Sequence, residues 1–388
     1  MRILILHSPY LSGSVSGENR VVEDEVRLLR DAGHDVLPYL AERRTEGGMG
    51  SLREGFSAIW SREATRDVRG LLRDHRPDVV HCHNLFPGLS PAVVRLVRDT
   101  SSALVMTLHN FRLLCLPATL LRDGKVCEEC LGKLPWRGVV HRCYRDSAAG
   151  SSALATSIGI HRALGTFDAV DLYLAVSDFV GAKHIEAGLG VDRVITKSNF
   201  AWPAERRRGP GDYFLFAGRL AREKGVRILI DAWQALEARL VVVGDGPEAQ
   251  TLRRMAPDSV EFRSPVSPDE MPRLLAGARG LVLPSVWYEG APRSILEAYA
   301  AGVPVLASSV GGLPEMVTDA VTGLLFPPEN SRALAAAAER LCDDGESARL
   351  GEGAWTAWSE RFTPGRALEN LEHAYRTACS RAQSLHSA

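Results

Sequence analysis

Short runs of β-branched and leucine-rich residues alternate with longer amphipathic segments along the first half of the chain. This alternation is typical of parallel βαβ units. In the segment Asn19–Ala32, for example, Val22 and Val26 lie on one apolar stripe, and acidic and Arg residues occupy the other face. Gly33 then ends the predicted helix as its C-cap. The predicted strands of this half are Arg2–His7, Asp35–Tyr39, Val79–Cys82, Ala103–Leu108 and Leu172–Val176.

A second series of the same kind follows Pro203–Gly211, a segment rich in Pro, Gly and Arg that is typical of an interdomain linker. The chain of 388 residues also exceeds what one hydrophobic core usually organises. We therefore predict an α/β protein with two Rossmann-like, doubly wound domains that face a central cleft. The predicted strands of this half are Tyr213–Ala217, Leu240–Val243, Val260–Phe262, Gly280–Leu283, Pro304–Ala307 and Gly323–Phe326.

The predicted domains run over residues 1–198 and 199–369. A C-terminal helix over 370–388 joins the first of them. Residues 112–146 depart from the alternation of strands and helices, because they are polar and contain four cysteines. We predict that they form an insert in the first domain.

Composition excludes two classes of protein. Hydrophobic residues make up 45% and charged residues 24%, with no apolar run near the ~20 residues of a membrane span. The run Arg2–His7 is too short for a signal peptide, so we expect a cytoplasmic protein. A net charge of −1 argues against a dedicated nucleic-acid binder. In the predicted helix 52–72, apolar residues are interleaved with Arg, a pattern that also occurs in helices on membrane surfaces. We favour packing of the apolar residues in the protein core as its explanation.

The strongest functional signal is the pair Glu289 and Glu297, which follows a predicted buried strand. We predict the first in a strand-to-helix loop and the second about two turns into the helix. A carboxylate at such a strand end can accept hydrogen bonds from paired hydroxyls, such as those of a ribose. Gly290 and Ala291 leave backbone N–H groups free for a diphosphate. An acidic N-cap followed by a solvated Glu is the alternative without function.

The segment Gly218–Gly225 comes directly after the predicted strand Tyr213–Ala217. It carries Arg219 and Lys224, and two fixed cations can hold a leaving diphosphate. Lys occurs at only five positions, so a random surface charge at Lys224 is less expected. Taken alone, the segment would more simply be a solvated basic turn.

Weaker signals lie in other loops. Gly244–Pro247 and Gly311–Glu315 are Gly-rich turns after predicted strands, where a ligand can approach the backbone closely. Ser12–Glu18 follows the first strand without the spacing of a dinucleotide fingerprint, although it can still reach phosphate oxygens at a helix start. His83 and His109 end neighbouring strands and point to the same region.

Together these motifs resemble the retaining family 4 glycosyltransferases (glycosyl transferases group 1) of the GT-B fold, over nearly the whole chain. The resemblance implies that the second domain binds a nucleotide-sugar, and it places His109, Glu289, Arg219 and Lys224 at the reacting centre. Glu18, His83 and His109 are the implied acceptor residues. The implied donor residues are Gly17, Gly218, Arg219, Lys224, Gly244, Gly246, Glu289, Gly290, Ala291, Pro292 and Glu297.

The resemblance also implies a mechanism. The nucleoside diphosphate departs, the acceptor hydroxyl attacks the same face of an oxocarbenium-like sugar, and the departing phosphate takes the acceptor proton. No Asp-x-Asp motif appears in the expected place, and the family implies no catalytic metal ion. The expected donor is a UDP-linked hexose or N-acetylhexosamine, and acceptors of such families are glycans, lipids or small-molecule natural products.

Four cysteines of the insert have the spacing of a metal site. A close pair, Cys127 and Cys130, is flanked by Cys115 and Cys143, which fits a tetrahedral structural zinc in a reducing compartment. The insert has little apolar content, so ligation would supply its order. An iron–sulfur cluster and unligated surface thiols are the alternatives.

Two other functions compete with the transferase. A nucleotide-sugar epimerase of the same fold would need an acid/base pair for proton abstraction or elimination, and the sequence offers no further carboxylate cluster for it. A zinc-stabilised nucleotide-sugar-binding protein without activity would not need the intact Glu289, Glu297, Arg219 and Lys224.

Overall fold

The computed structural model describes residues 1–9, 16–41 and 57–386, which form two compact units. The first comprises Met1–Leu120, Cys127–Lys197 and Leu368–Ala388, and the second comprises Leu121–Val126 and Ser198–Ala367. Most of the predicted loop Ser12–Glu18 and the first part of the predicted helix 52–72 lie outside the described residues.

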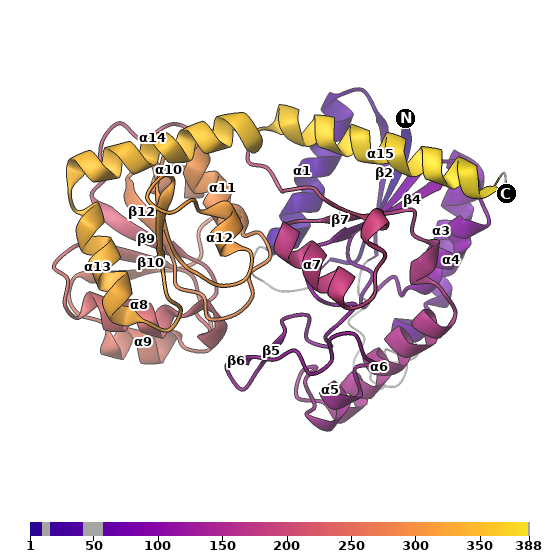
Figure 1. The fold of residues 1–388 in the computed structure, drawn as a ribbon, viewed down its shortest axis with the longest axis horizontal. Coiled ribbons are helices and arrows are strands. Elements are labelled where there is room, and N and C mark those ends of the chain that lie inside the picture. The colour runs from indigo at the N-terminus through magenta and orange to yellow at the C-terminus, as the bar shows by residue number, and fades with distance from the viewer. Residues whose placement is uncertain (10–15, 42–56, 387–388) are drawn as a thin grey trace. The chain divides into compact units, whose positions relative to one another are not determined.

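The first unit contains a six-stranded parallel sheet in the order β2-β1-β3-β4-β7-β8, which confirms the predicted sheet (Figure 1). Its strands are β1 (Arg2–His7), β2 (Asp35–Leu40), β3 (Val79–Cys82), β4 (Ala103–Leu108), β7 (Leu172–Ala175) and β8 (Val194–Thr196). The first, third and fourth agree with the prediction residue for residue. The edge strand β8 was missed, because three residues carry too little pattern to predict a strand.

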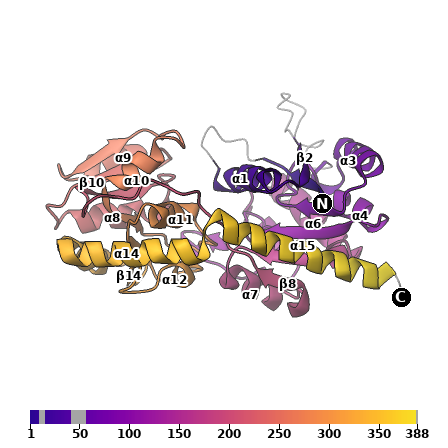
Figure 2. The same cartoon turned by 90° about the horizontal axis from the view of Figure 1, so that it is seen from above.

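The helices of the first unit cover its sheet through apolar stripes. In α1, residues Val22, Val26 and Leu29 are buried, as the stripe predicted. The last helix, α15, lies along this unit from Leu368 onward (Figure 2), where Arg381 donates to the Asp171 carbonyl oxygen at 3.4 Å. The helices are α1 (Gly17–Asp31), α3 (Arg62–His75), α4 (Ala92–Arg98), α5 (Trp136–Val140), α6 (Ala148–Ala163), α7 (Asp178–Glu186) and α15 (Pro364–His386).

The second unit repeats the design with a parallel sheet in the order β11-β10-β9-β12-β13-β14. Successive residues of a strand face opposite sides of a sheet. Accordingly, Phe214 and Phe216 pack in one core layer with α8 and α13, whereas Leu215 packs in the other with α11 and α14 (Figure 1). The strands are β9 (Tyr213–Ala217), β10 (Leu240–Val243), β11 (Val260–Arg263), β12 (Ala278–Leu283), β13 (Val305–Ser308) and β14 (Gly323–Phe326).

The remaining elements are the helices of the second unit and several short segments. The helices that pack in its two core layers are α8 (Val226–Trp233), α11 (Arg293–Ala300), α13 (Ser331–Leu341) and α14 (Asp344–Arg361). Shorter ones are α9 (Ala249–Met255), α10 (Met271–Ala276) and α12 (Leu313–Met316). A small hairpin joins β5 (Leu121–Arg122) to β6 (Lys125–Val126), and three 3₁₀ turns are η1 (Phe167–Ala169), η2 (Val191–Arg193) and η3 (Arg222–Lys224). In the part of the chain that the structure describes, no helix has the length and apolar character to cross a membrane.

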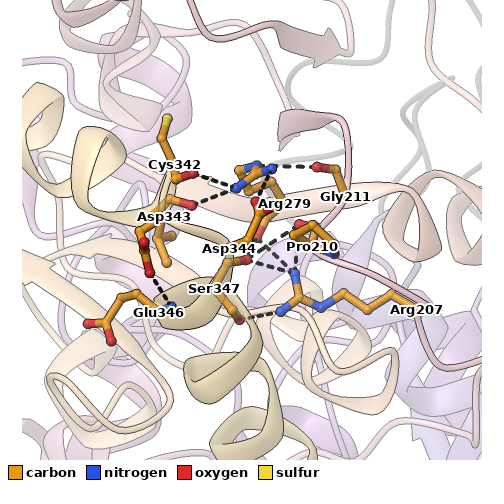
Figure 3. Close-up of polar contacts among 10 residues, drawn as sticks. Arg207, Pro210, Gly211, Arg279, Cys342, Asp343, Asp344, Glu346 and Ser347 are labelled. Atoms are coloured by element: carbon orange, nitrogen blue, oxygen red, sulfur yellow. Dashed lines mark hydrogen bonds and ion pairs between the residues drawn. The ribbon is translucent and has the colours of Figure 1, made fainter.

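The end of the predicted linker Pro203–Gly211 is tied to the second unit by two half-buried arginines (Figure 3). Arg207 donates to the Pro210 carbonyl oxygen at 3.0 Å and to Ser347 Oγ at 3.1 Å. Arg279 donates to the Gly211 carbonyl oxygen at 3.2 Å. Burial, with Arg279 and Arg206 nearby, lowers the pKa of Arg207 to about 10. The end of this segment is therefore held by hydrogen bonds and is not a loose connection.

Candidate functional site

The central pair of the second unit joins two strand-to-helix loops. Lys224 lies in the turn after β9, and Glu289 lies in the loop after β12. Lys224 Nζ donates to Glu289 Oε1 at 2.7 Å, although 65 positions separate the two residues. Gly225 permits this approach, because its φ is +68° and a Cβ there would overlap the carbonyl oxygen of Pro284.

Glu289 is almost fully buried, with 6% of its surface exposed. Its Oε1 also accepts hydrogen bonds from Ser285 Oγ at 2.6 Å and from Trp287 Nε1 at 2.8 Å. Burial alone would raise the pKa of Glu289, but the charge of Lys224 and the three hydrogen bonds hold the pKa below its ordinary value. The site therefore stabilises an ionised carboxylate beside a cation.

Ser285 and Trp287 were missed by the sequence analysis. Besides its hydrogen bond to Glu289, the Trp287 ring lies under Lys224, with Nζ 4.9 Å from the ring centroid. Both residues lie on the same loop as Glu289, four and two positions before it. A polar or aromatic side chain this close to a predicted carboxylate was the available signal.

Glu297 lies in α11, which begins after Pro292. The helix starts at Arg293, so Glu297 is about one turn into it and not two as predicted. Arg293 Nη2 donates to Glu297 Oε1 at 3.1 Å, and the Glu297 side chain is 34% exposed. The alternative of an acidic N-cap is wrong, since Pro292 and not Glu289 holds the N-cap position.

Three predicted glycines meet in the turns after β9 and β10. A Cβ on Gly244 would overlap the Gly218 carbonyl oxygen, and a Cβ on Gly246 would overlap that of Leu220. Leu220 N donates to the Asp245 carbonyl oxygen at 2.9 Å. The two turns thus pack backbone against backbone, which side chains at these positions would prevent.

The loop Gly311–Glu315 supports Glu289 from a third strand end. Gly312 N donates to the Glu289 carbonyl oxygen at 2.8 Å, and a Cβ on Gly311 would lie 2.8 Å from the Glu289 amide nitrogen. This Gly-rich loop, a weak motif in the sequence, therefore has a structural role: it holds the backbone of Glu289 in place.

Arg219 does not join the pair. Its side chain is 66% exposed, and its Nη1 lies 3.7 Å from Glu223 Oε1. Lys224 and Arg219 are therefore placed differently within one turn: the first is bound to Glu289 and the second projects toward solvent.

In the first unit, the two predicted histidines touch. His83 follows β3, His109 follows the adjacent strand β4, and His83 Nδ1 lies 2.8 Å from His109 Nε2. Both line a pocket together with Glu18, so the structure brings the three predicted acceptor residues to one place. The other residues of its lining include Asn84, Phe86, Met106, Asn110 and Arg112.

These histidines are neutral over the physiological pH range. Burial, with Lys197 and His7 nearby, lowers the pKa of His109 to about 3. Burial and neighbouring basic groups hold the pKa of His83 well below its ordinary value. A neutral imidazole offers one donor and one acceptor, so the tautomer decides what His109 presents to the pocket.

The start of α1 contributes Gly17 and Glu18. Among the described residues, no atom lies within 4 Å of where a Cβ on Gly17 would stand. Glu18 Oε1 accepts from Asn110 Nδ2 at 2.6 Å, which joins the helix start to the loop after β4. This hydrogen bond positions a carboxylate at the pocket.

None of the four cysteines of the insert forms a disulfide. Cys115 is buried, whereas Cys127, Cys130 and Cys143 are half-buried. Within the described residues, three or more ligand atoms lie within 4.8 Å of one another only at Glu25, His81 and His83. No three of the four thiols therefore lie within 4.8 Å of one another in this structure. The zinc site stays a prediction.

Comparisons with known proteins agree with the motifs. The profile of the glycosyl transferase 4-like domain matches residues 16–199, and that of the glycosyl transferases group 1 matches residues 211–344. The D-inositol 3-phosphate glycosyltransferase of Acidothermus cellulolyticus is 31% identical over 325 residues, which cover 78% of this chain and 67% of that protein. The GDP-mannose-dependent alpha-mannosyltransferase of Corynebacterium glutamicum is 33% identical over 159 residues, or 41% of this chain and 38% of that protein.

A solved structure shows the same architecture. The crystal structure of Anabaena Alr3699/HepE in complex with UDP and glucose matches with a TM-score of 0.65 and 18% identity, over 96% of this chain and 98% of that chain. At this identity the likeness shows the fold, which is GT-B.

Proposed function

This chain belongs to the group 1 glycosyltransferases of the GT-B fold, and on that premise we propose that it moves a hexose or N-acetylhexosamine from a nucleotide-sugar to an acceptor hydroxyl with retention of configuration. We favour a UDP-sugar as donor. The binding of UDP and glucose by the structural neighbour supports this choice, and the name of the mannosyltransferase relative makes GDP-mannose the first competitor.

One observation carries the proposal: a cation and a buried carboxylate are held together at the carboxyl ends of parallel strands. Lys224 would hold the leaving diphosphate with Arg219, whose exposed side chain can turn toward an anion. Glu289 would lie near the donor sugar and Glu297 would bind the ribose. These roles extend the family resemblance to this chain, and of the four residues the fold holds Lys224 and Glu289 in direct contact.

In the proposed reaction the protein supplies charge and position and no covalent nucleophile. Fixed cations stabilise the diphosphate as the glycosidic bond breaks. The acceptor hydroxyl then attacks from the face that the diphosphate leaves, and the departing phosphate takes its proton. Because protein cations meet the developing charge, we propose that catalysis needs no metal ion, so turnover in EDTA should equal turnover without it.

The first experiment is a thermal-shift panel with UDP, GDP, ADP, dTDP and their sugars, followed by transfer assays with each stabilising donor. Stabilisation by one nucleotide family supports the donor site if it is lost in Lys224→Ala and kept in Lys133→Ala. Lys133 is the control because it is exposed and distant from Lys224 in the sequence. Inositol 3-phosphate, named in one relative, is the first acceptor to try, ahead of glycan and lipid acceptors. Donor turnover that gives epimerised sugar without transfer, or no stabilisation by any nucleotide, would contradict the proposal.

A further inference from the structure

A buried ion pair lies behind the histidine pocket of the first unit. Glu25, on α1, and Lys197, just after β8, have exposed fractions of 0% and 1%. Lys197 Nζ donates to Glu25 Oε1 across 172 positions of sequence. Removing two charges from water costs more than such a pair usually returns, so a buried ion pair is weak evidence for a purely stabilising role.

The second oxygen of Glu25 faces the histidines. Glu25 Oε2 lies 3.6 Å from His83 Nε2, and within the described residues both atoms are buried and have no hydrogen-bond partner. The other nitrogen of His83 bonds to His109 Nε2 at 2.8 Å. Lys197, Glu25, His83 and His109 therefore form a continuous series of polar contacts that ends at the pocket.

The series determines where the imidazole protons lie. At 3.6 Å the carboxylate oxygen and His83 Nε2 are a few tenths of an ångström beyond a hydrogen bond, but a bare nitrogen lone pair facing an anion would be repelled. The proton of neutral His83 therefore lies on Nε2, and Nδ1 is an acceptor. His109 must then donate from Nε2, which leaves its Nδ1 without a proton.

We propose that the Glu25–Lys197 pair sets the tautomer of His83 and, through it, that of His109, so that His109 offers Nδ1 as a hydrogen-bond acceptor to a hydroxyl of the bound substrate. The catalytic consequence rests on the proposed transferase function. Glu25 and Lys197 act as positioning residues, and neither touches the substrate. Lys197 keeps the carboxylate neutralised, so that neither histidine has to take up a proton to balance its charge.

The surrounding groups favour this role over a metal site. Ligand atoms of Glu25, His81 and His83 lie within 4.8 Å of one another, but the ammonium of Lys197 already neutralises the carboxylate. His81 is occupied on both sides, by the Tyr375 hydroxyl at 2.9 Å and by Thr107 Oγ1 at 2.7 Å. The ammonium group of Lys197 therefore occupies the place beside Glu25 that a metal ion would need.

The first test measures the tautomers in the wild-type protein without substrate. Ring ¹⁵N shifts and ¹⁵N–¹H couplings of the ¹⁵N-histidine-labelled protein distinguish Nε2–H from Nδ1–H, and His109→Gln and His83→Gln assign the signals. We expect Nε2–H for both residues at pH 7. A proton on Nδ1 of either residue would overturn the proposal. Because no substrate is present, this result does not depend on whether the protein is a transferase.

The second test removes both charges of the pair at once, so that the net charge of the protein stays the same and the two side chains keep about the same volume. In Glu25→Gln/Lys197→Met, the Gln amide offers both a donor and an acceptor to His83 Nε2, so no anion fixes the proton there and forms of both histidines with Nδ1–H become populated. We expect these forms by NMR and a fall in kcat of at least about twofold, as for equal populations of the two tautomers, with little change in the donor KM. Glu23→Gln, an exposed carboxylate on the same helix with a side chain 62% exposed, is the control and should change neither quantity.

Several outcomes would refute the positioning role. A folded double variant with unchanged tautomers shows that the ion pair does not control them, and a shifted tautomer with unchanged kcat shows that the tautomer does not matter for transfer. If the double variant does not fold, the wild-type tautomers still decide the proposal. A wild-type protein with the expected tautomers but no transfer activity would leave the tautomer assignment standing and remove the proposed function.

Discussion

Replacing Lys224 with Met separates the two roles of the Lys224–Glu289 pair. The substitution removes the cation and roughly keeps the volume, so a buried carboxylate is left with Ser285 and Trp287 as donors. Breaking a fully buried pair costs about 3–5 kcal/mol. Because the Lys224 side chain is 27% exposed and two hydrogen bonds remain, we expect a loss of about 2 kcal/mol in the free energy of unfolding at pH 7.

The loss should depend on pH. In the wild-type protein the pKa of Glu289 is lowered, so its contribution to stability is present above the unfolded-state pKa and is lost as the pH falls. Without Lys224, burial raises that pKa, and the contribution is then lost as the pH rises through the new folded-state value. The difference in stability between wild type and variant should therefore be small near pH 4 and grow toward pH 7, which urea denaturation at several pH values can measure.

A double variant completes the test. In Lys224→Met/Glu289→Gln no charge is buried, so stability should return to within about 1 kcal/mol of wild type, while transfer stays lower by about 10²–10³-fold. Arg219→Met is the matched control, because its side chain is 66% exposed and should change stability by less than about 0.5 kcal/mol. A pH-independent loss in Lys224→Met, or recovery of transfer in the double variant, would refute the reasoning.

Three further changes test other parts of the molecule. Gly225→Ala should lower the free energy of unfolding by about 3 kcal/mol in urea, because φ is +68° and the new Cβ would overlap the Pro284 carbonyl oxygen; a loss below about 1 kcal/mol would contradict that geometry. Cys127→Ser/Cys130→Ser should release bound zinc and lower the melting temperature, as elemental analysis and calorimetry can check; an unchanged metal content and melting temperature would remove the predicted site. Arg207→Met should cost about 1–2 kcal/mol by thermal denaturation, because it removes hydrogen bonds to two half-buried carbonyl oxygens, and a near-neutral effect would show that water replaces the guanidinium.

Local pattern predicted most of the secondary structure. The runs Arg2–His7 and Leu240–Val243 became strands with the predicted bounds, because a fully buried parallel strand needs consecutive apolar residues and ends where they end. The stripe of Val22 and Val26 predicted the buried face of α1 for the same reason. The edge strand β8 was missed, since its pairing with β7 depends on a neighbour that the local sequence does not reveal.

The residues of the candidate site were recognisable by type, and their partners were not. Glu289, Lys224 and His109 stand beside predicted strand ends, so sequence and resemblance single them out. Nothing in the sequence pairs Lys224 with Glu289, or Lys197 with Glu25, across 65 and 172 positions. Sequence periodicity determines which residues of an element are buried. Only the order and register of the strands determine which loops meet, and those contacts decide the charge and proton position of each group in the site.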